Sequence, residues 1–251
     1  MEARYSSLTR ARTWKTSEGE GELDLIAEGI AEAFRLLVKG DREVLRIALL
    51  TLRVSGLATI ISAAIGVPLG TALAVWSHRG RTRVAGFVNA GMGLPPVVVG
   101  LWVSIFLWRT GPLGFLRLMY SPTAMVIAQT IIALPIVTGF TMAGVGQLDP
   151  GIRLQMLSLG ASSWQLLRIL IREAKLSVLA AIMAGFGRVV AEVGASMMVG
   201  GNLLGQTRVL TTATSMEVSK GNFGLAIALS IILVAITYII NASLTRIQQQ
   251  G

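Results

Sequence analysis

The sequence predicts an all-α, polytopic transmembrane protein with about five membrane spans and an amphipathic helix before the first span. Hydrophobic residues make up 53% of the 251 residues and charged residues only 14%, whereas a soluble domain carries roughly 25% charged residues. The apolar residues gather in long runs that short polar stretches separate. At about 20 residues per span plus loops, a chain of this length has room for roughly five or six spans.

Residues 1–43 are expected to remain outside the hydrocarbon as a tail and an interfacial helix. Within residues 23–38 the apolar residues recur at helical spacing. This segment is too short and too charged to span a bilayer, so the pattern predicts an amphipathic helix lying flat on the membrane interface. The charged residues between its apolar positions are Asp24, Glu28, Glu32 and Arg35.

A transmembrane domain is predicted over residues 44–245, with a short tail at residues 246–251. Its spans are expected at about 45–76, 84–108, 122–146, 176–199 and 222–244. Prolines inside the first three spans should kink or break the helices, because proline lacks an amide donor and clashes with the preceding turn. These prolines are Pro68, Pro95, Pro96 and Pro135.

The basic residues of the short loops predict the orientation. Successive loops lie on alternating sides of the membrane, and the loops on one side hold eight Lys and Arg residues while those on the other hold four. Cytoplasmic loops carry the excess of Lys and Arg, so the side with eight should be cytoplasmic and the side with four external. Five spans then place the N-terminus outside and the C-terminus in the cytoplasm. The first side holds Arg79, Arg81, Arg83, Arg153, Arg168, Arg172, Lys175 and Arg246, and the second holds Arg109, Arg117, Arg208 and Lys220.

Residues 148–175 predict two short amphipathic helices on the basic side. A first helix at 152–159 should end at Gly160, a favourable left-handed cap, and Ser162 or Ser163 can cap a second helix through Ile171. Such a pair forms either a knob that another protein contacts or a loop that lies on lipid. The residues that would make the contact are Leu154, Gln155, Met156, Leu157, Gly160, Ala161, Ser162 and Trp164.

The fourth span and the loop after it contain the candidates for a transport path. Arg188 and Glu192 are four residues apart and can meet on one helical face, either as a static ion pair or as part of a gate, and Arg53 is a second candidate partner of Glu192. The loop at 200–215 is rich in glycine and threonine, whose backbone donors and hydroxyls suit the transient passage of an ion or simply make a turn. The path residues expected here, besides the prolines, are Arg188, Glu192, Met197, Met198, Gly201, Asn202, Thr207 and Thr211.

The chain carries no sign of covalent chemistry. It has no phosphate-binding Gly-x-x-x-x-Gly-Lys-Ser/Thr segment, so any ATP and Mg would be used by a partner subunit. A single histidine and no cysteine leave no metal-ligand spacing. The net charge of +9 is spread over the loops as membrane topology requires, so it does not indicate nucleic-acid binding.

Four segments resemble the permease subunits of binding-protein-dependent ABC importers. Gly160-Ala161-Ser162 is similar to the coupling loop of that family, although Leu154-Gln155-Met156 stands where the family has Glu-Ala-Ala. Residues 66–70 and 94–101 resemble its core helices. Residues 187–202 resemble the molybdate, sulfate and tungstate branch, and Ala-Glu-Val-Gly-Ala with Met-Met-Val-Gly-Gly-Asn is closest to tungstate permeases.

The resemblance implies a type I ABC importer permease fold and a place in the plasma or inner membrane. It also implies a homodimer with a central path for tungstate, two separate ATP-binding subunits and an extracytoplasmic oxyanion-binding protein. Molybdate and sulfate are the alternative substrates. An ion-coupled secondary transporter or a channel is the alternative of another class, but neither requires a docking knob, and the sequence shows no internal repeat of the kind secondary carriers have.

Overall fold

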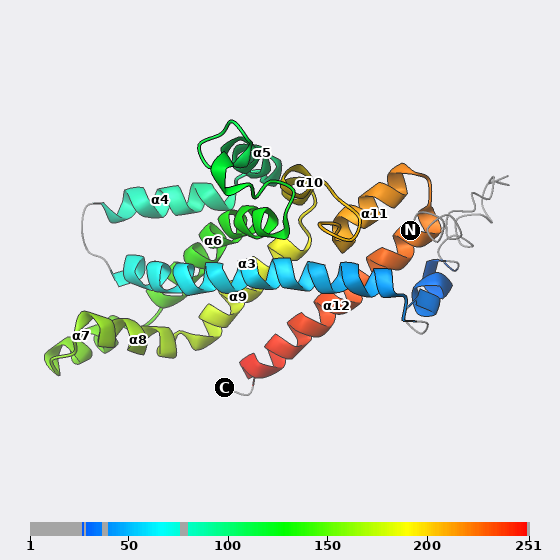
Figure 1. Ribbon diagram of the computed structural model, residues 1–251. Coiled ribbons are helices and arrows are strands. Elements are labelled where there is room, and N and C mark those ends of the chain that lie inside the picture. Colours follow the sequence, from blue (N-terminus) through cyan, green and yellow to red (C-terminus); the bar gives the residue numbers. More distant parts are fainter. Residues whose placement is uncertain (1–26, 28, 37–39, 76–79, 250–251) are drawn as a thin grey trace.

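The computed structural model describes residue 27 and residues 29–36, 40–75 and 80–249. All regular elements of this part are helical, which confirms the all-α class. The predicted tail at 1–21 lies outside the described residues. The helices, labelled as in Figure 1, are α3 (Arg42–Val75), α4 (Arg81–Met92), α5 (Pro96–Leu107), the 3-10 turn η1 (Gly114–Leu116), α6 (Pro122–Gly146), α7 (Pro150–Ser158), α8 (Ser163–Glu173), α9 (Lys175–Val190), α10 (Gly194–Gly200), α11 (Leu210–Ser219) and α12 (Phe223–Gln249).

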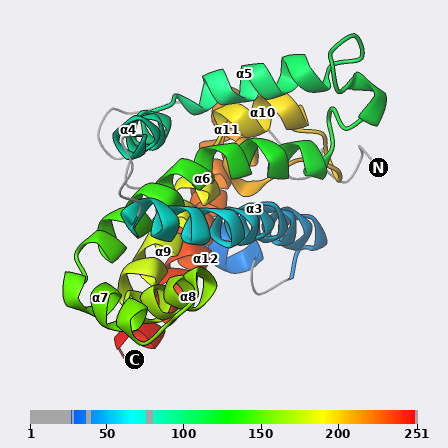
Figure 2. The same cartoon turned by 90° about the vertical axis from the view of Figure 1, so that its left-hand side faces the viewer.

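Five segments of the described chain correspond to the five predicted spans. Helices α3, α6 and α12 are each long and apolar enough to cross a membrane. The other two predicted spans are bent pairs of helices rather than single helices: α4 and α5 meet at 99°, and α9 and α10 meet at 60°. Figure 2 shows the first break, with α4 seen end-on and α5 seen along its side.

The prolines act differently from one another. Pro95 and Pro96 coincide with the break before α5, as expected. Pro135 does not break its span, since α6 runs without interruption from Pro122 to Gly146, so that expectation was wrong. Helix α3 likewise continues past Pro68 to Val75. Both prolines lie in helices that pack closely on each other, and tertiary packing holds such a helix together despite one missing hydrogen bond.

Small residues allow α3 and α6 to approach closely. A Cβ on Gly66 would lie 3.0 Å from the Thr138 hydroxyl, and a Cβ on Gly70 would lie 2.5 Å from the Thr138 carbonyl oxygen. The spacing of these two glycines is the small-xxx-small pattern of close membrane helix pairs. The pair α3–α6 therefore forms the centre of the bundle, and α5, α9 and α10 complete its apolar core around Val54, Met125 and Val189.

The described part of the predicted amphipathic helix, residues 29–36, is helical. Ala33 and Leu36 are buried in one apolar cluster with Leu210 and Leu229, which come from α11 and α12. Ile30 and Phe34 are exposed. The segment is therefore amphipathic as predicted, but its inner face packs on the protein and only its outer face is left for the membrane interface.

The two ends of the bundle differ in character. One end holds the start of α4, the pair α7–α8 and the last turns of α12 (Figure 1). Gln248 there donates a hydrogen bond to the Leu176 carbonyl oxygen at 3.4 Å, so the C-terminal part of α12 lies beside the start of α9. The opposite end holds the start of α3 and helix α11. The relative directions of the spans thus agree with the predicted five-span topology.

Candidate functional site

The pair α7–α8, which we call the docking knob (residues 150–173), is built from local sequence signals. Asp149 accepts a hydrogen bond from the Gly151 amide at 2.8 Å and so caps α7. Gly160 follows that helix with a φ of +78°, a left-handed conformation that glycine adopts without steric cost. Ser162 and Gln165 then form a reciprocal capping box at the start of α8. Both helices lie within two residues of their predicted bounds.

The docking knob has one buried face and one exposed apolar face. Leu166 and Leu170 of α8 are buried in a cluster with residues of α3, α6 and α9. On the outside, Trp164 is 70% exposed, and Leu154 and Leu157 are also exposed. Of the other predicted contact residues, Gln155, Gly160 and Ser162 are exposed, while Met156 and Ala161 are half-buried. Exposed apolar side chains gathered on a projecting element mark a surface that contacts either another protein or the membrane.

A cavity of about 350 Å³ lies beside the docking knob, between α3 and α8. Its walls are mainly apolar, with two guanidinium groups among them. The sequence had counted these arginines only for the orientation of the chain, although their spacing of four residues on an amphipathic helix signals a shared face. The lining residues are Pro68, Trp164, Leu167, Arg168, Ile171 and Arg172.

The two broken spans meet next to α6. A Cβ on Gly194, the first residue of α10, would lie 2.6 Å from a methyl group of Val97 in the first turn of α5. A Cβ on Gly91, near the end of α4, would lie 3.0 Å from the Cβ of Pro135. The predicted path residues Pro95, Pro96 and Pro135 therefore belong to one neighbourhood, in which Pro95 is exposed and the other two are half-buried.

The predicted ion pair between Arg188 and Glu192 is not formed, and that expectation was wrong. Helix α9 ends at Val190, so the two residues do not share a helical face. The Glu192 carboxylate instead accepts a hydrogen bond from the Ala195 amide at 2.9 Å, at the start of α10. The ion pairs of the described residues join Arg35 to Glu32 and Lys220 to Glu217. Glu192 is 7% exposed and holds the break, whereas Arg188 and Arg53 are exposed.

The segment after α10 is more ordered than a flexible loop, because α11 occupies half of it. Thr207 is buried; its hydroxyl donates to the Gly200 carbonyl oxygen at 2.6 Å and accepts from the Leu203 amide at 2.9 Å. The Thr211 hydroxyl donates to the Glu192 carbonyl oxygen at 3.0 Å. These two hydroxyls thus support the local backbone in the structure. The expectation of a loop over residues 200–215 was wrong in its second part, because α11 begins at Leu210.

The remaining gate candidates surround the turn between α10 and α11. Met197 is exposed and Met198 is half-buried. Gly201 and Asn202 both have positive φ angles, +69° and +52°. A Cβ on Gly201 would lie 2.7 Å from the ring of Tyr120, so this turn requires glycine for its backbone conformation and for space.

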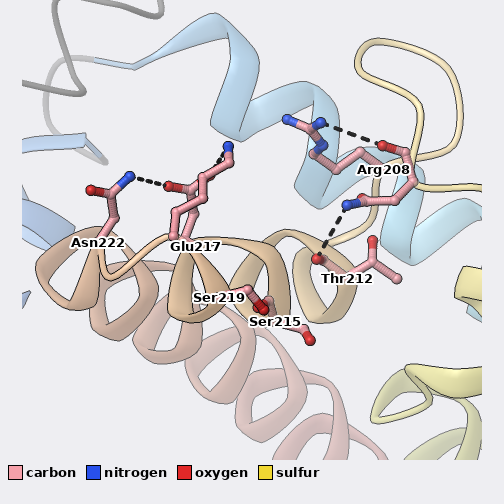
Figure 3. A network of polar contacts seen from close by, with 8 residues as sticks. Arg208, Thr212, Ser215, Glu217, Ser219 and Asn222 are labelled. Atoms are coloured by element: carbon pink, nitrogen blue, oxygen red, sulfur yellow. Dashed lines mark hydrogen bonds and ion pairs between the residues drawn. The ribbon is translucent and has the colours of Figure 1, made fainter.

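A polar network at the same end of the bundle was not predicted (Figure 3). Glu217 of α11 is fully buried; its carboxylate pairs with Lys220 at 3.0 Å and accepts a hydrogen bond from the side-chain amide of Asn222 at 2.7 Å. The Arg208 guanidinium donates to the Asn202 carbonyl oxygen at 3.4 Å. The Asn202 side chain, which donates to the Thr212 carbonyl oxygen at 3.5 Å, joins the turn to α11, and the contacts of Glu217 join α11 to the residues before α12. The sequence signal was the Glu217–Lys220 spacing of three residues, which fits a helical ion pair.

Several apolar spans, two broken helices that meet beside a central pair, and a projecting docking knob together define a polytopic membrane transport subunit. The family comparison agrees with this class. The chain belongs to the family described as binding-protein-dependent transport system inner membrane component, whose model matches residues 66–250.

Relatives and solved structures place it within that family. The chain is 39% identical to the tungstate uptake system permease protein TupB of Peptoclostridium acidaminophilum, over 91% of this chain and 100% of that protein. It is 32% identical to the TupB protein of Campylobacter jejuni, over 87% of this chain and 92% of that protein. The structure matches the MetNI methionine ABC transporter in an inward-facing conformation with a TM-score of 0.71 at 20% identity, covering 83% of this chain and 95% of that chain. The type I importer permease fold is thus confirmed.

Proposed function

We propose that this chain forms the membrane path of an ATP-driven importer for an oxyanion, and that the oxyanion is tungstate. The likeness to a tungstate uptake permease over that protein's entire length carries the substrate assignment. Molybdate and sulfate have the same tetrahedral shape and double negative charge, so a path that fits one of them is chemically suited to all three. They remain the alternative substrates.

The docking knob would contact a separate ATP-binding subunit, which would use the ATP and Mg. Its exposed Leu154, Leu157 and Trp164 offer apolar area to such a partner, and Gln155, Gly160 and Ser162 lie on the same exposed surface. The half-buried Met156 and Ala161 would support that surface from below. A conformational change of the partner would be transmitted to the helix bundle by Leu166 and Leu170, which pack on α3, α6 and α9.

The path would lie between two copies of the chain. The two breaks and Pro135 would line it near the middle of the membrane, since irregular backbone is tolerated at that depth only where protein or a water-filled cavity surrounds it. Met197, Met198 and the turn with Gly201 and Asn202 would close it at the outer end. Thr207 and Thr211 would act on this closure through the backbone that their hydroxyls hold.

The docking knob end would face the cytoplasm, and the end with the Glu217 network would face an extracytoplasmic oxyanion-binding protein. The excess of arginine and lysine on the docking knob side supports this orientation. On this view residues 1–43 are external and residues 246–251 are cytoplasmic. A secondary transporter or channel would not need the docking knob, which makes that alternative less suitable.

The test is uptake by proteoliposomes that contain this chain, its ATP-binding subunit and its binding protein. When ATP is present, radiolabelled tungstate should accumulate in the compartment that the docking knob faces. Unlabelled tungstate should reduce this uptake more strongly than unlabelled molybdate or sulfate does. If none of the three oxyanions enters, the proposed function is wrong. If molybdate or sulfate competes better, only the choice of tungstate is wrong.

A further inference from the structure

Arg188 lies at the middle of a broken membrane span. The span formed by α9 and α10 runs from Lys175 to Gly200, and Arg188 follows its first residue by thirteen positions and precedes its last by twelve. At about 1.5 Å per residue, α9 carries Arg188 roughly 20 Å from Lys175. That distance puts a guanidinium group well inside a hydrocarbon layer about 30 Å thick.

The described chain offers Arg188 no negative partner. The carboxylate of Glu192, four residues on, is buried and held by the Ala195 amide. Helices α5, α6, α10 and α12 contain no aspartate or glutamate. In α3 and α8, which also contact α9, the only carboxylates are Glu43 in the first turn and Glu173 in the last turn. No ion pair of the described residues includes Arg188.

The charge of Arg188 at this depth argues against a position facing lipid. A charged side chain at the bilayer centre is costly against lipid, and such residues face the bundle interior, a partner or a water-filled path. Arg188 is exposed in the single chain, so the surface that carries it is covered by a second copy or lines the path between copies. A second copy brings the same sequence, and the carboxylate that its α9–α10 segment carries, Glu192, is buried and held by the Ala195 amide.

We propose that Arg188 lines the path and contacts the oxyanion in transit. This inference rests on the proposed function and adds to it the residue that recognises the charge of the substrate. The planar guanidinium can donate two parallel hydrogen bonds to a tetrahedral oxyanion. A guanidinium group from each copy would attract a dianion, and a small number of such charges avoids the tight binding that would stop its release.

The experiment uses Arg188→Cys in the naturally cysteine-free chain, assembled with its ATP-binding subunit and binding protein in proteoliposomes. The variant should form the dimer, and its rate of tungstate uptake should be at least tenfold lower than that of the parent. Reaction with a trimethylammonium-bearing methanethiosulfonate should restore uptake severalfold, because it returns a positive charge. The neutral methyl reagent should not restore it, and tungstate should slow both reactions.

Val234→Cys is the matched control. Val234 lies near the middle of α12 and is 66% exposed in a wholly apolar region, so its thiol should face lipid and not react. The inference is wrong if Arg188→Cys transports at the parent's rate, if its thiol does not react, or if the dimer is lost, which would show a structural contact. If the parent itself imports no tungstate, molybdate or sulfate, the proposed function fails and this inference fails with it.

Discussion

At the scale of single residues, two glycines are required for different reasons, and substitutions distinguish the two reasons. Gly160 has a φ of +78° with nothing within 4 Å of a Cβ, so its requirement is conformational. Gly70 is in an ordinary helix, where a Cβ would lie 2.5 Å from the Thr138 carbonyl oxygen, so its requirement is space. The first belongs to the docking knob and the second to the bundle core.

Gly160→Val should uncouple ATP hydrolysis from uptake while the dimer still assembles. A side chain in the left-handed region costs about 1–2 kcal/mol, and the strain falls on the turn between α7 and α8. The measurement compares ATPase rate and tungstate uptake in the same proteoliposomes. Gly160→Asn is the control, since asparagine tolerates this conformation and should stay coupled. Full uptake in the valine variant would contradict the docking role of this turn.

Gly70→Ala should weaken the bundle without touching the docking knob. The added methyl group overpacks the contact between α3 and α6, which costs about 1–3 kcal/mol. Thermal unfolding of the detergent-purified protein should therefore shift to lower temperature. Gly56→Ala in the same helix has open space around the new Cβ and should be neutral or stabilising by up to about 1 kcal/mol. Equal shifts in the two variants would count against the close α3–α6 contact.

At the scale of elements, the turn between α10 and α11 depends on buried hydroxyl groups. Thr207→Ala removes the partner of both the Gly200 carbonyl oxygen and the Leu203 amide. Leaving such buried groups unsatisfied costs about 1–3 kcal/mol, so the variant should unfold at lower temperature. Thr207→Ser keeps the hydroxyl and should resemble the parent. A Thr207→Ala dimer that is fully stable but defective in uptake would assign the hydroxyl to the path instead.

The elements also show which features local sequence determines. Helix α6 has its predicted bounds, because Ser121 and Pro122 mark its start and its apolar run is continuous. The bend between α9 and α10 was missed, because an apolar run without periodicity looks like one helix. The hydrogen bonds that stabilise the bend, from the Ala195 amide to the Glu192 carboxylate and from the Thr211 hydroxyl to the Glu192 carbonyl oxygen, are visible only in the structure. Helix α11 was missed because threonine and glycine favour turns, whereas packing on α12 and the buried Glu217 stabilise a helix there.

At the scale of the whole molecule, the sequence predicted the spans, the alternating directions in which they run, and the family. It did not place the two breaks side by side, since that contact joins Gly194 to Val97 across almost a hundred residues. For the same reason it paired Arg188 with Glu192 by spacing alone. Contacts between distant segments decide both features, and helical periodicity carries no information about them.

The orientation is open to direct labelling because the chain has no cysteine. Thr110 lies after α5, on the side that is proposed to be external, and Ser163 lies on the docking knob; both residues are exposed and are replaced by cysteine one at a time. An impermeant thiol reagent added to intact cells should label the first variant and label the second only after permeabilisation. Labelling of Ser163→Cys in intact cells would reverse the proposed orientation.

The most direct test of the central claim is the energy source of uptake. Proteoliposomes with the docking knob inward, the ATP-binding subunit inside and the tungstate-loaded binding protein outside should accumulate tungstate only when they enclose ATP and Mg. Uptake should continue when ionophores collapse the proton and sodium gradients. Accumulation that needs an ion gradient and proceeds without ATP would contradict the account and favour a secondary transporter.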